Sequence, residues 1–491
     1  MKRLLLLLPL LAACAHSPVR GDIHKRGWLL VETAHISLRT DLDRADAVDH
    51  AVKLERDWSA LAHLYGLVAP GRPPPGRPFP VMHLASCSDF ERLRSGDVAG
   101  FVYGSAEGDI AVTCEDRGGL TLVHELAHIF NHDHFARLPR WLDEGLATYY
   151  STIEVSRGRA VLGNFPSPLS FVWNHPKWLP SLDQLRAMSP GEFYDPMHSA
   201  ENYFSAWKLV HLLNNTSPAR QQAFRAYLAA LGRGEPDHAA WTAAFSGEAG
   251  DDLASDYTTY QKRERVNRLV TAYQPTPPAP PRVRRLRPGE IHVLWASALA
   301  VEHPDEVAVQ LDRARAADPD WPDLLYWRAV LVRPRDRIRL LRDYVTRVPR
   351  DPRGWRALVS ARIAEVPGGE EPLIGTPPAA LTAIEPDVRQ LIEHADDPTS
   401  LNLIGWYWAV RRKPNVGLNF ALRAVQAEPS CGACWDTVGV LYFQAGKVEL
   451  AVESQERAAG IYAERVPPDV TTRLRRFREA LRRRPPAGSA R

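Results

Sequence analysis

The chain has little of several features that would place it in a specialised class. Five cysteines in 491 residues are too few for a small disulfide-held scaffold. The charges of its 61 basic and 58 acidic residues nearly balance, so the net charge of +3 does not suggest a nucleic-acid partner. Only 8 of those 61 basic residues are lysine, which leaves 53 arginines. With 45% hydrophobic and 24% charged residues, the composition excludes wholesale disorder and a polytopic membrane protein, and the length predicts about three domains.

Long hydrophobic runs are also missing, except for one near the N-terminus. Residues 4–11 follow two basic residues and are too short to span a bilayer, but they are typical of an export signal. Residues 11–14, Leu-Ala-Ala-Cys, resemble the lipobox of bacterial lipoproteins; the alternative is an ordinary signal that contains a cysteine. The resemblance implies that residues 1–14 form the signal, that Cys14 carries the lipid, and, because Ala15 follows, that the protein is anchored in the outer membrane facing the periplasm.

The four remaining cysteines would then lie in an oxidising compartment. Cys87, Cys114, Cys431 and Cys434 form an even set, so two disulfides are possible. Cys431-Gly-Ala-Cys434 could also be a redox or zinc motif, but neither a second closely spaced pair nor a thioredoxin-like strand pattern accompanies it. We therefore favour a local structural disulfide over two inert thiols.

Helical and β-like patterns alternate in the first half of the chain. They predict an extended segment, a helix and three short strands, at residues 28–39, 45–64, 81–84, 101–104 and 109–113. From residue 121 to about residue 263 the pattern is helical. We therefore expect an α+β domain over residues 28–262, with a small mixed sheet.

A proline-rich segment separates this domain from a second one. Five prolines within residues 275–281 predict an extended spacer, which we place at residues 263–289. From 290 to 480 the chain forms helical pairs with a period of 34 residues, which relates Gly405 to Gly439. That spacing resembles the tetratricopeptide repeat (TPR), and the resemblance implies an all-α repeat domain that binds a protein partner.

One segment carries the residues of a metal site. His124-Glu125-Leu126-Ala127-His128 has the pattern H-E-x-x-H on an apolar helical background. Residues four apart lie one above the other on a helix, so both histidines can reach one cation with Glu125 beside them. The alternative is a helix with two solvated or hydrogen-bonded histidines.

A second helix is predicted just downstream of this pattern. Pro139 suits its first turn, and Gly145 would let it approach the first helix closely, so that Glu144 can supply a third ligand. H-E-x-x-H followed by W-L-x-E-G-x-A at residues 141–147 resembles the gluzincin metallopeptidases of the peptidase MA-like superfamily. The resemblance covers residues 28–262.

The gluzincin resemblance implies a ligand set and a mechanism. Zn²⁺ would be bound by His124, His128 and Glu144, with one position left for water. Glu125 would be the base that takes the proton of that water during peptide hydrolysis. The family also uses a tyrosine that donates to the oxyanion, for which Tyr203 is our candidate; core packing is the alternative role of this side chain.

His134 offers a competing third ligand. It lies six residues after His128, which is the spacing of metzincins, whose pattern is H-E-x-x-H-x-x-G-x-x-H. Asn131 stands where that pattern has glycine, and asparagine tolerates a positive φ. No convincing methionine turn follows, so we favour Glu144 and expect His132 and His134 to be exposed beyond the end of the helix.

Two functions from different classes fit these observations. The first is a lipid-anchored zinc peptidase that hydrolyses proteins or peptides of the cell envelope, with repeats that bind substrate or partner. The second is a repeat-based scaffold lipoprotein whose metallopeptidase-like domain is catalytically weak. The enzyme is favoured because both motifs keep the residues needed for catalysis, namely His124, Glu125, His128 and Glu144. The β-like runs at 100–104 and 109–113 could pair with substrate backbone, or only stabilise the fold.

Overall fold

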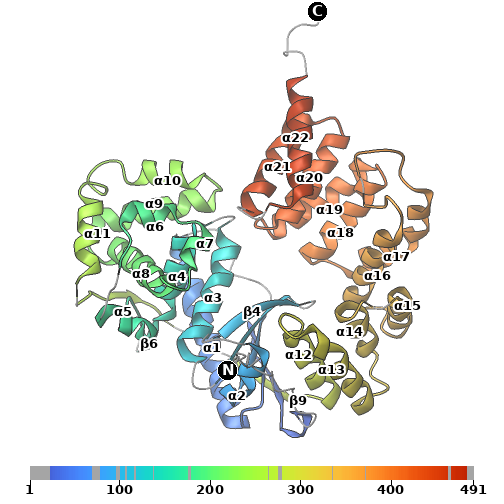
Figure 1. The fold of residues 1–491 in the computed structure, drawn as a ribbon, viewed down its shortest axis with the longest axis horizontal. Coiled ribbons are helices and arrows are strands. Elements are labelled where there is room, and N and C mark those ends of the chain that lie inside the picture. The colour runs from blue at the N-terminus through green and yellow to red at the C-terminus, as the bar shows by residue number, and fades with distance from the viewer. Residues whose placement is uncertain are drawn as a thin grey trace, which may run out of the picture.

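The computed structural model is mostly helical, with a small sheet near the N-terminus (Figure 1). It describes residues 23–68, 78–94, 100–105, 108–114, 118–135, 138–156, 158–174, 178–263, 265–274, 279–333, 335–370, 372–462 and 466–483. The lipobox with Cys14, residues 69–77 of the proline-rich stretch, and residues 275–278 lie outside these ranges.

A six-stranded mixed sheet organises the N-terminal unit. Its strands lie in the order β4-β5-β3-β2-β1-β9. Strands β2, β3 and β5 run parallel, while β1, β4 and β9 are antiparallel to their neighbours. The strands are β1 Leu29–Glu32, β2 Ile36–Thr40, β3 Phe79–Leu84, β4 Gly100–Ser105, β5 Gly108–Cys114 and β9 Arg282–Arg285. The three short strands predicted at 81–84, 101–104 and 109–113 are confirmed as β3, β4 and β5, while the extended segment predicted at 28–39 is divided into the antiparallel pair β1 and β2.

Alternate side chains of the strands enter two different cores, as the period of two in a strand requires. On one face Val31, Leu38 and Val81 join the core that contains α1 and α3. On the other face Met82 and Leu84 join the core that contains α2 and α12. The covering helices are α1 Arg44–Val68, α2 Cys87–Leu93, α3 Gly118–His134 and α12 Pro288–Leu299.

The expected spacer over residues 263–289 is partly sheet. Strand β9 extends the edge of the large sheet beside β1. Strand β8 (Leu269–Ala272) completes a small sheet with β6 (Glu154–Ser156) and β7 (Arg159–Leu162), in the order β6-β7-β8. Pro281 directly precedes β9, and proline is tolerated there because an edge strand leaves some N–H positions without a ladder partner. The chain thus returns to the first domain before it enters the repeats.

The remaining helices of the first half form one unit with α1 and α3. Their apolar side chains belong to the same core as the α3 face of the sheet. The elements are α4 Arg140–Ser151, β6 Glu154–Ser156, β7 Arg159–Leu162, α5 Ser170–Asn174, α6 Leu182–Ala187, α7 Pro190–Phe193, α8 Ser199–Asn215, α9 Pro218–Gly232, α10 Asp237–Ala244 and α11 Leu253–Gln261.

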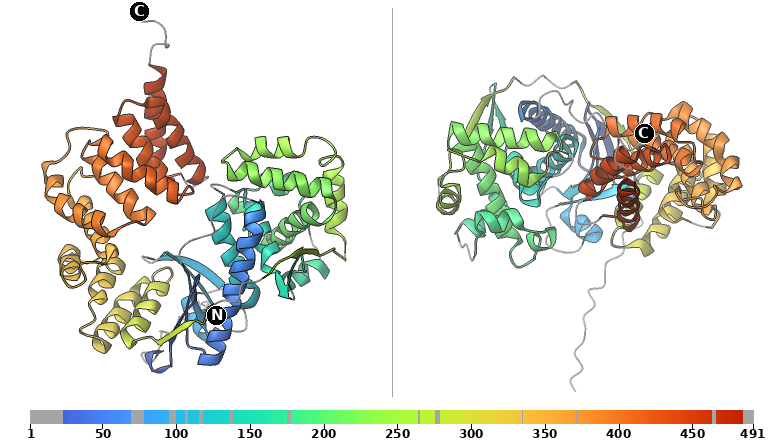
Figure 2. Two further views of the ribbon diagram at one scale, coloured as in Figure 1. Left: turned by 180° about the vertical axis from the view of Figure 1, so that it is seen from behind. Right: turned by 90° about the horizontal axis from the view of Figure 1, so that it is seen from above.

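The C-terminal half is a series of helical hairpins that curves from α12 to α22, coloured yellow to red (Figure 2). Gly405 and Gly439 occupy equivalent crossings: a Cβ on Gly405 would lie 3.1 Å from the Cβ of Ala421, and one on Gly439 would lie 2.6 Å from Oε1 of Gln455. The period of 34 therefore marks the same close helix contact twice. The helices are α13 Pro304–Ala317, α14 Asp323–Leu331, α15 Arg337–Arg347, α16 Pro352–Glu365, α17 Glu385–His394, α18 Pro398–Val410, α19 Pro414–Ala427, α20 Gly432–Gln444, α21 Val448–Tyr462 and α22 Pro468–Arg482.

The first of these helices also belongs to the sheet. Ile291, Leu294 and Trp295 of α12 are buried with the strand residues on the α2 face. The Trp295 ring meets the Trp28 ring edge to face, with the centroids 6.4 Å apart. The repeats therefore do not form a separate unit beyond a spacer, because their first helix is part of the core of the first domain.

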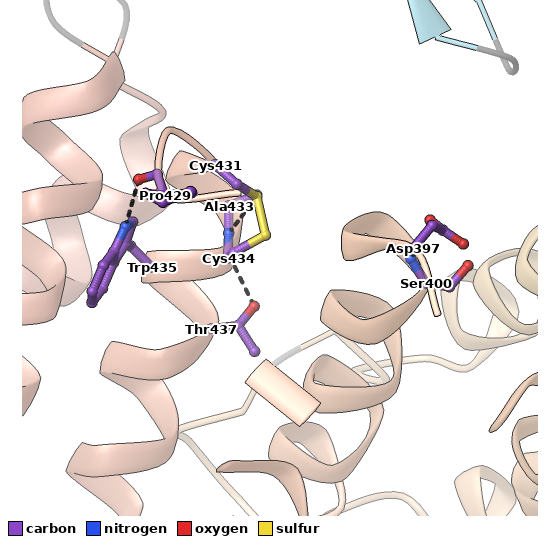
Figure 3. The surroundings of a disulfide bond; sticks show 8 residues. All are labelled: Asp397, Ser400, Pro429, Cys431, Ala433, Cys434, Trp435 and Thr437. Atoms are coloured by element: carbon purple, nitrogen blue, oxygen red, sulfur yellow. Dashed lines mark hydrogen bonds between the residues drawn. A yellow bond between two sulfur atoms is a disulfide. The ribbon is translucent and has the colours of Figure 1, made fainter. Parts of the chain in front are cut away.

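The structure contains two disulfides, of which the local one between Cys431 and Cys434 was predicted and the other was one of the possible pairs. Cys87 pairs with Cys114 and so connects α2 to the end of β5. Cys431 pairs with Cys434 in the first turn of α20, where the Trp435 indole donates to the carbonyl of Pro429 at 2.9 Å (Figure 3). Among the helices that the structure describes, we find none with the length and apolar character needed to cross a bilayer.

Candidate metal centre

Three side chains from two consecutive helices converge on one point. His124 and His128 lie one turn apart on α3, and Glu144 lies on α4. The two Nε2 atoms are 3.1 Å apart, and Oε2 of Glu144 lies 3.3 Å from each of them. The Glu144 carboxylate is buried, while both imidazoles remain partly exposed, so the cluster has one open side.

The size of this triangle fits a tetrahedral zinc site. Zinc binds nitrogen and oxygen ligands at about 2.0–2.2 Å, so the ligand atoms of a tetrahedron lie roughly 3.3–3.6 Å apart. The observed separations of 3.1 to 3.3 Å are close to this value. The three side chains could therefore hold a zinc ion.

Asp143, which no sequence motif marked, sets the orientation of His128. Its Oδ1 lies 2.9 Å from Nδ1 of His128, and its Oδ2 accepts from Arg140 at 3.0 Å. Asn131 donates to the same Oδ1 at 2.9 Å. A carboxylate at Nδ1 keeps the proton on that nitrogen and leaves the lone pair of Nε2 for a metal. In the sequence, only its position directly before the ligand candidate Glu144 could have indicated that Asp143 orients His128.

The cluster attracts positive charge. Burial alone would lower the pKa of His128, but the carboxylates of Asp143 and Glu144 raise it well above its ordinary value. Burial would likewise raise the pKa of Glu144, but His128 and His124 hold it well below its usual range. Glu144 is therefore ionised, as a carboxylate ligand must be.

Two tyrosines and Glu125 complete the surroundings. The Tyr194 hydroxyl donates to Oε1 of Glu144, which leaves Oε2 facing the histidines. Tyr203 on α8 is half-buried, and its ring centroid lies 6.2 Å from that of His124. Burial and the negative charge of Glu144 raise the pKa of Tyr203, and the charge of half-buried Glu125 acts in the same direction. The structure thus brings the predicted residues together and adds Tyr194, which no motif marked.

Gly145 has a different neighbour from the one expected. A Cβ at this position would lie 2.8 Å from Cγ2 of Val210 and 2.9 Å from the carbonyl oxygen of Ala206. Both residues belong to α8, so the glycine allows α4 to approach α8 rather than α3. Its role is therefore to bring the helix that carries Tyr203 against the helix that carries Glu144.

His134 is placed away from the cluster. Helix α3 continues through His134, so Asn131 and His132 lie inside it and the turn of a metzincin does not form. His134 is 1% exposed, and its Nδ1 lies 3.0 Å from the carbonyl oxygen of Phe130. Among the described residues, the groups that could share an ion are His124-His128-Glu144 and His128-His132-Asp143, and neither includes His134. The expectation that His134 is exposed is wrong, because the helix is one turn longer than predicted.

The edge strand β4 begins beside α3. A Cβ on Gly100 would lie 2.7 Å from Cγ2 of Thr121, which precedes His124 by three residues. In the six-stranded sheet β4 is an outer strand, paired with β5. The start of the outer strand β4 therefore contacts α3 one turn before His124.

Comparison with known proteins finds similarity to TPR structures. A thermophilic TPR protein of Thermus thermophilus is 18% identical and covers 39% of this chain and 98% of its own, with a TM-score of 0.30. The TPR domain of P58(IPK) is 13% identical and covers 58% of this chain and 75% of its own, with a TM-score of 0.22. No protein-family model and no curated protein matches the chain.

Proposed function

We propose that the chain is a zinc-dependent peptidase of the gluzincin type. The observation that supports this most directly is the triangle of His124 Nε2, His128 Nε2 and Glu144 Oε2, whose sides of 3.1 to 3.3 Å suit one tetrahedral zinc ion. The H-E-x-x-H pattern and the ionised third ligand agree with it. When bound, the metal would act as a Lewis acid that lowers the pKa of a water molecule and polarises a peptide carbonyl.

The side chains around the cluster have distinct roles in this proposal. Glu125, one residue from His124 and half-exposed on the same helix, accepts the proton that the attacking water loses and delivers it to the leaving amine. Tyr203 donates a hydrogen bond to the carbonyl oxygen as negative charge develops on it. The raised pKa of Tyr203 keeps its hydroxyl protonated, which this donation requires.

The proposed substrate is a protein or peptide. Strand β4 offers an outer edge beside α3, which can bind any extended backbone with little side-chain selection. We further propose that the protein is anchored through Cys14 to the outer membrane, so that the substrates are proteins or peptides of the cell envelope, and that the repeats bind substrate or a partner protein.

Glu125→Gln tests the proposal. The purified chain should hold about one zinc ion and should hydrolyse an unfolded protein, and Glu125→Gln should keep the zinc and lose hydrolysis, because Glu125 is a base and not a ligand. Glu91→Gln, at an exposed position on α2, is the matched control. Zinc binding without any hydrolysis that depends on Glu125 would favour the scaffold function instead.

A further inference from the structure

The two disulfides of the chain close loops of very different length. Cys87 and Cys114 are 27 residues apart and join α2 to a strand, whereas Cys431 and Cys434 are only three residues apart in the first turn of α20. The stabilisation that a disulfide gives by restricting the unfolded chain grows with the length of the loop that it closes. The disulfide in α20 therefore contributes less to stability than the other one does.

Cys431 is the N-cap of α20. The backbone N–H of Cys434 donates to its Sγ at 3.1 Å, which is the hydrogen bond that a serine or aspartate accepts at the start of a helix (Figure 3). The N-terminus of a helix carries a partial positive charge, and a thiolate placed there is stabilised by it. Cys431 is also partly exposed, while Cys434 is fully buried.

The preceding repeat holds an acidic side chain at the equivalent position. Asp397 and Ser400 lie 34 residues before Cys431 and Cys434, and both pairs are drawn in Figure 3. The backbone N–H of Ser400 donates to Oδ1 of Asp397, the N-cap of α18, at 3.0 Å. Asp397 also pairs with Arg356, but the bond from the backbone is common to both caps. A repeat of this chain can thus begin its helix without a disulfide, with an acceptor of negative charge in the place of the Cys431 sulfur.

Cys434 has the surroundings of a protonated thiol. It is buried in the apolar core of the last repeats, together with Val438 and Ala424. A thiol in apolar surroundings stays protonated and packs as a small hydrophobic group. The reduced pair would therefore consist of a thiolate at the N-cap and a thiol in the core, which differ in reactivity.

We propose that Cys431 and Cys434 form a reversible dithiol–disulfide couple that exchanges with a protein dithiol. A thiolate of that protein attacks Sγ of Cys431, the bond between the two sulfur atoms breaks, and Cys434 leaves with the electron pair and takes up a proton. The second thiolate of the protein then attacks the protein's own sulfur in the mixed disulfide, which releases Cys431 as a thiolate. Two electrons thus pass to the pair and the protein dithiol becomes a disulfide, and the reverse sequence oxidises the pair again. The exchange does not depend on the metal cluster.

Equilibration of the full chain in glutathione buffers tests the couple. The reaction is stopped with acid, and the free thiols are alkylated and identified by peptide mass spectrometry. The ratio of squared reduced glutathione to oxidised glutathione that half-reduces Cys431–Cys434 should be lower by about tenfold or more than the ratio that half-reduces Cys87–Cys114, the internal control. Half reduction of both disulfides at the same ratio would overturn the proposal.

Single and double variants test which sulfur exchanges. Cys434→Ser leaves one thiol at the N-cap, and Cys431→Ser leaves one thiol in the core. Oxidised glutathione should form a mixed disulfide with Cys434→Ser at least about tenfold faster than with Cys431→Ser. The double variant Cys431→Asp with Cys434→Ser copies the cap of α18, so it should keep α20 folded and should take up no glutathione in this helix. Equal rates in the two single variants would overturn Cys431 as the exchanging residue.

Discussion

Nδ1 of His128 lies 2.9 Å from Oδ1 of the buried Asp143, the residue directly before Glu144. One helix α4 thus supplies a carboxylate to each side of the same imidazole. Asp143 orients the ring and fixes its tautomer, and Glu144 lies beside Nε2 at the candidate metal position.

Asp143→Asn should weaken zinc binding without removing a ligand. Loss of the carboxylate that orients a ligating histidine typically costs about 10- to 100-fold in metal affinity. Competition with a chromophoric chelator measures this effect, and Asp49→Asn at an exposed position of α1 is the control. Unchanged zinc affinity in Asp143→Asn would show that His128 does not depend on this carboxylate.

Glu144→Ala and His134→Ala should have opposite effects. Glu144→Ala leaves two imidazoles, so zinc should be lost on dialysis against a weak chelator and hydrolysis should fall with it. His134 packs against Tyr65 and Phe130, so His134→Ala should keep zinc but lower the free energy of unfolding by about 1–3 kcal/mol. Zinc content and denaturant unfolding of both variants decide this. Zinc retained in Glu144→Ala and lost in His134→Ala would contradict the proposed ligand set.

Trp295→Ala should destabilise the first domain although the residue lies in the repeats. Trp295 is fully buried against Trp28, and truncation of a buried tryptophan costs about 3–5 kcal/mol. Hydrogen exchange should therefore accelerate in β1 and β3 as well as in α12. Trp178→Ala, at a site 39% exposed, should leave these strands protected. Faster exchange confined to the repeats would mean that the two halves unfold independently.

His211 should make the protein less stable below about pH 6.5. Burial lowers the pKa of His211 to about 4, against about 6.5 in an unfolded chain. Between these values the unfolded chain binds more protons than the folded chain, so acid favours unfolding. The free energy of unfolding therefore falls as the pH decreases from about 6.5 to about 4, by at most about 3 kcal/mol. His211→Gln, which does not titrate, should show a smaller decrease in unfolding free energy over this interval. An identical pH dependence in the two proteins would rule out this contribution.

Cys14→Ser tests the proposed anchor. If Cys14 is the lipid site, the variant should leave the membrane fraction or remain unprocessed, because the thiol that carries the lipid is absent. Fractionation followed by mass measurement of the N-terminus provides the readout. Normal processing together with unchanged membrane retention would remove the lipoprotein proposal.

Local sequence was enough for the elements that depend on neighbours along the chain. The helices that carry His124, His128 and Glu144 follow from apolar periodicity and a proline at the start of α4. The disulfide between Cys431 and Cys434 follows from their spacing, and the equivalence of Gly405 and Gly439 follows from a period of 34. In each case the partners lie within one or two turns or repeat at a fixed distance.

Tertiary structure alone decided which side chains surround the candidate site. Tyr194 donates to Glu144, fifty residues away in the sequence. Gly145 faces α8 because the packing of α3, α4 and α8, and not their order in the chain, determines which two of these helices come closest. His134 points into the core because one extra turn of α3 rotates it there. Helix α12 joins the sheet because its apolar face is buried there, and no local pattern records which surface a helix will cover.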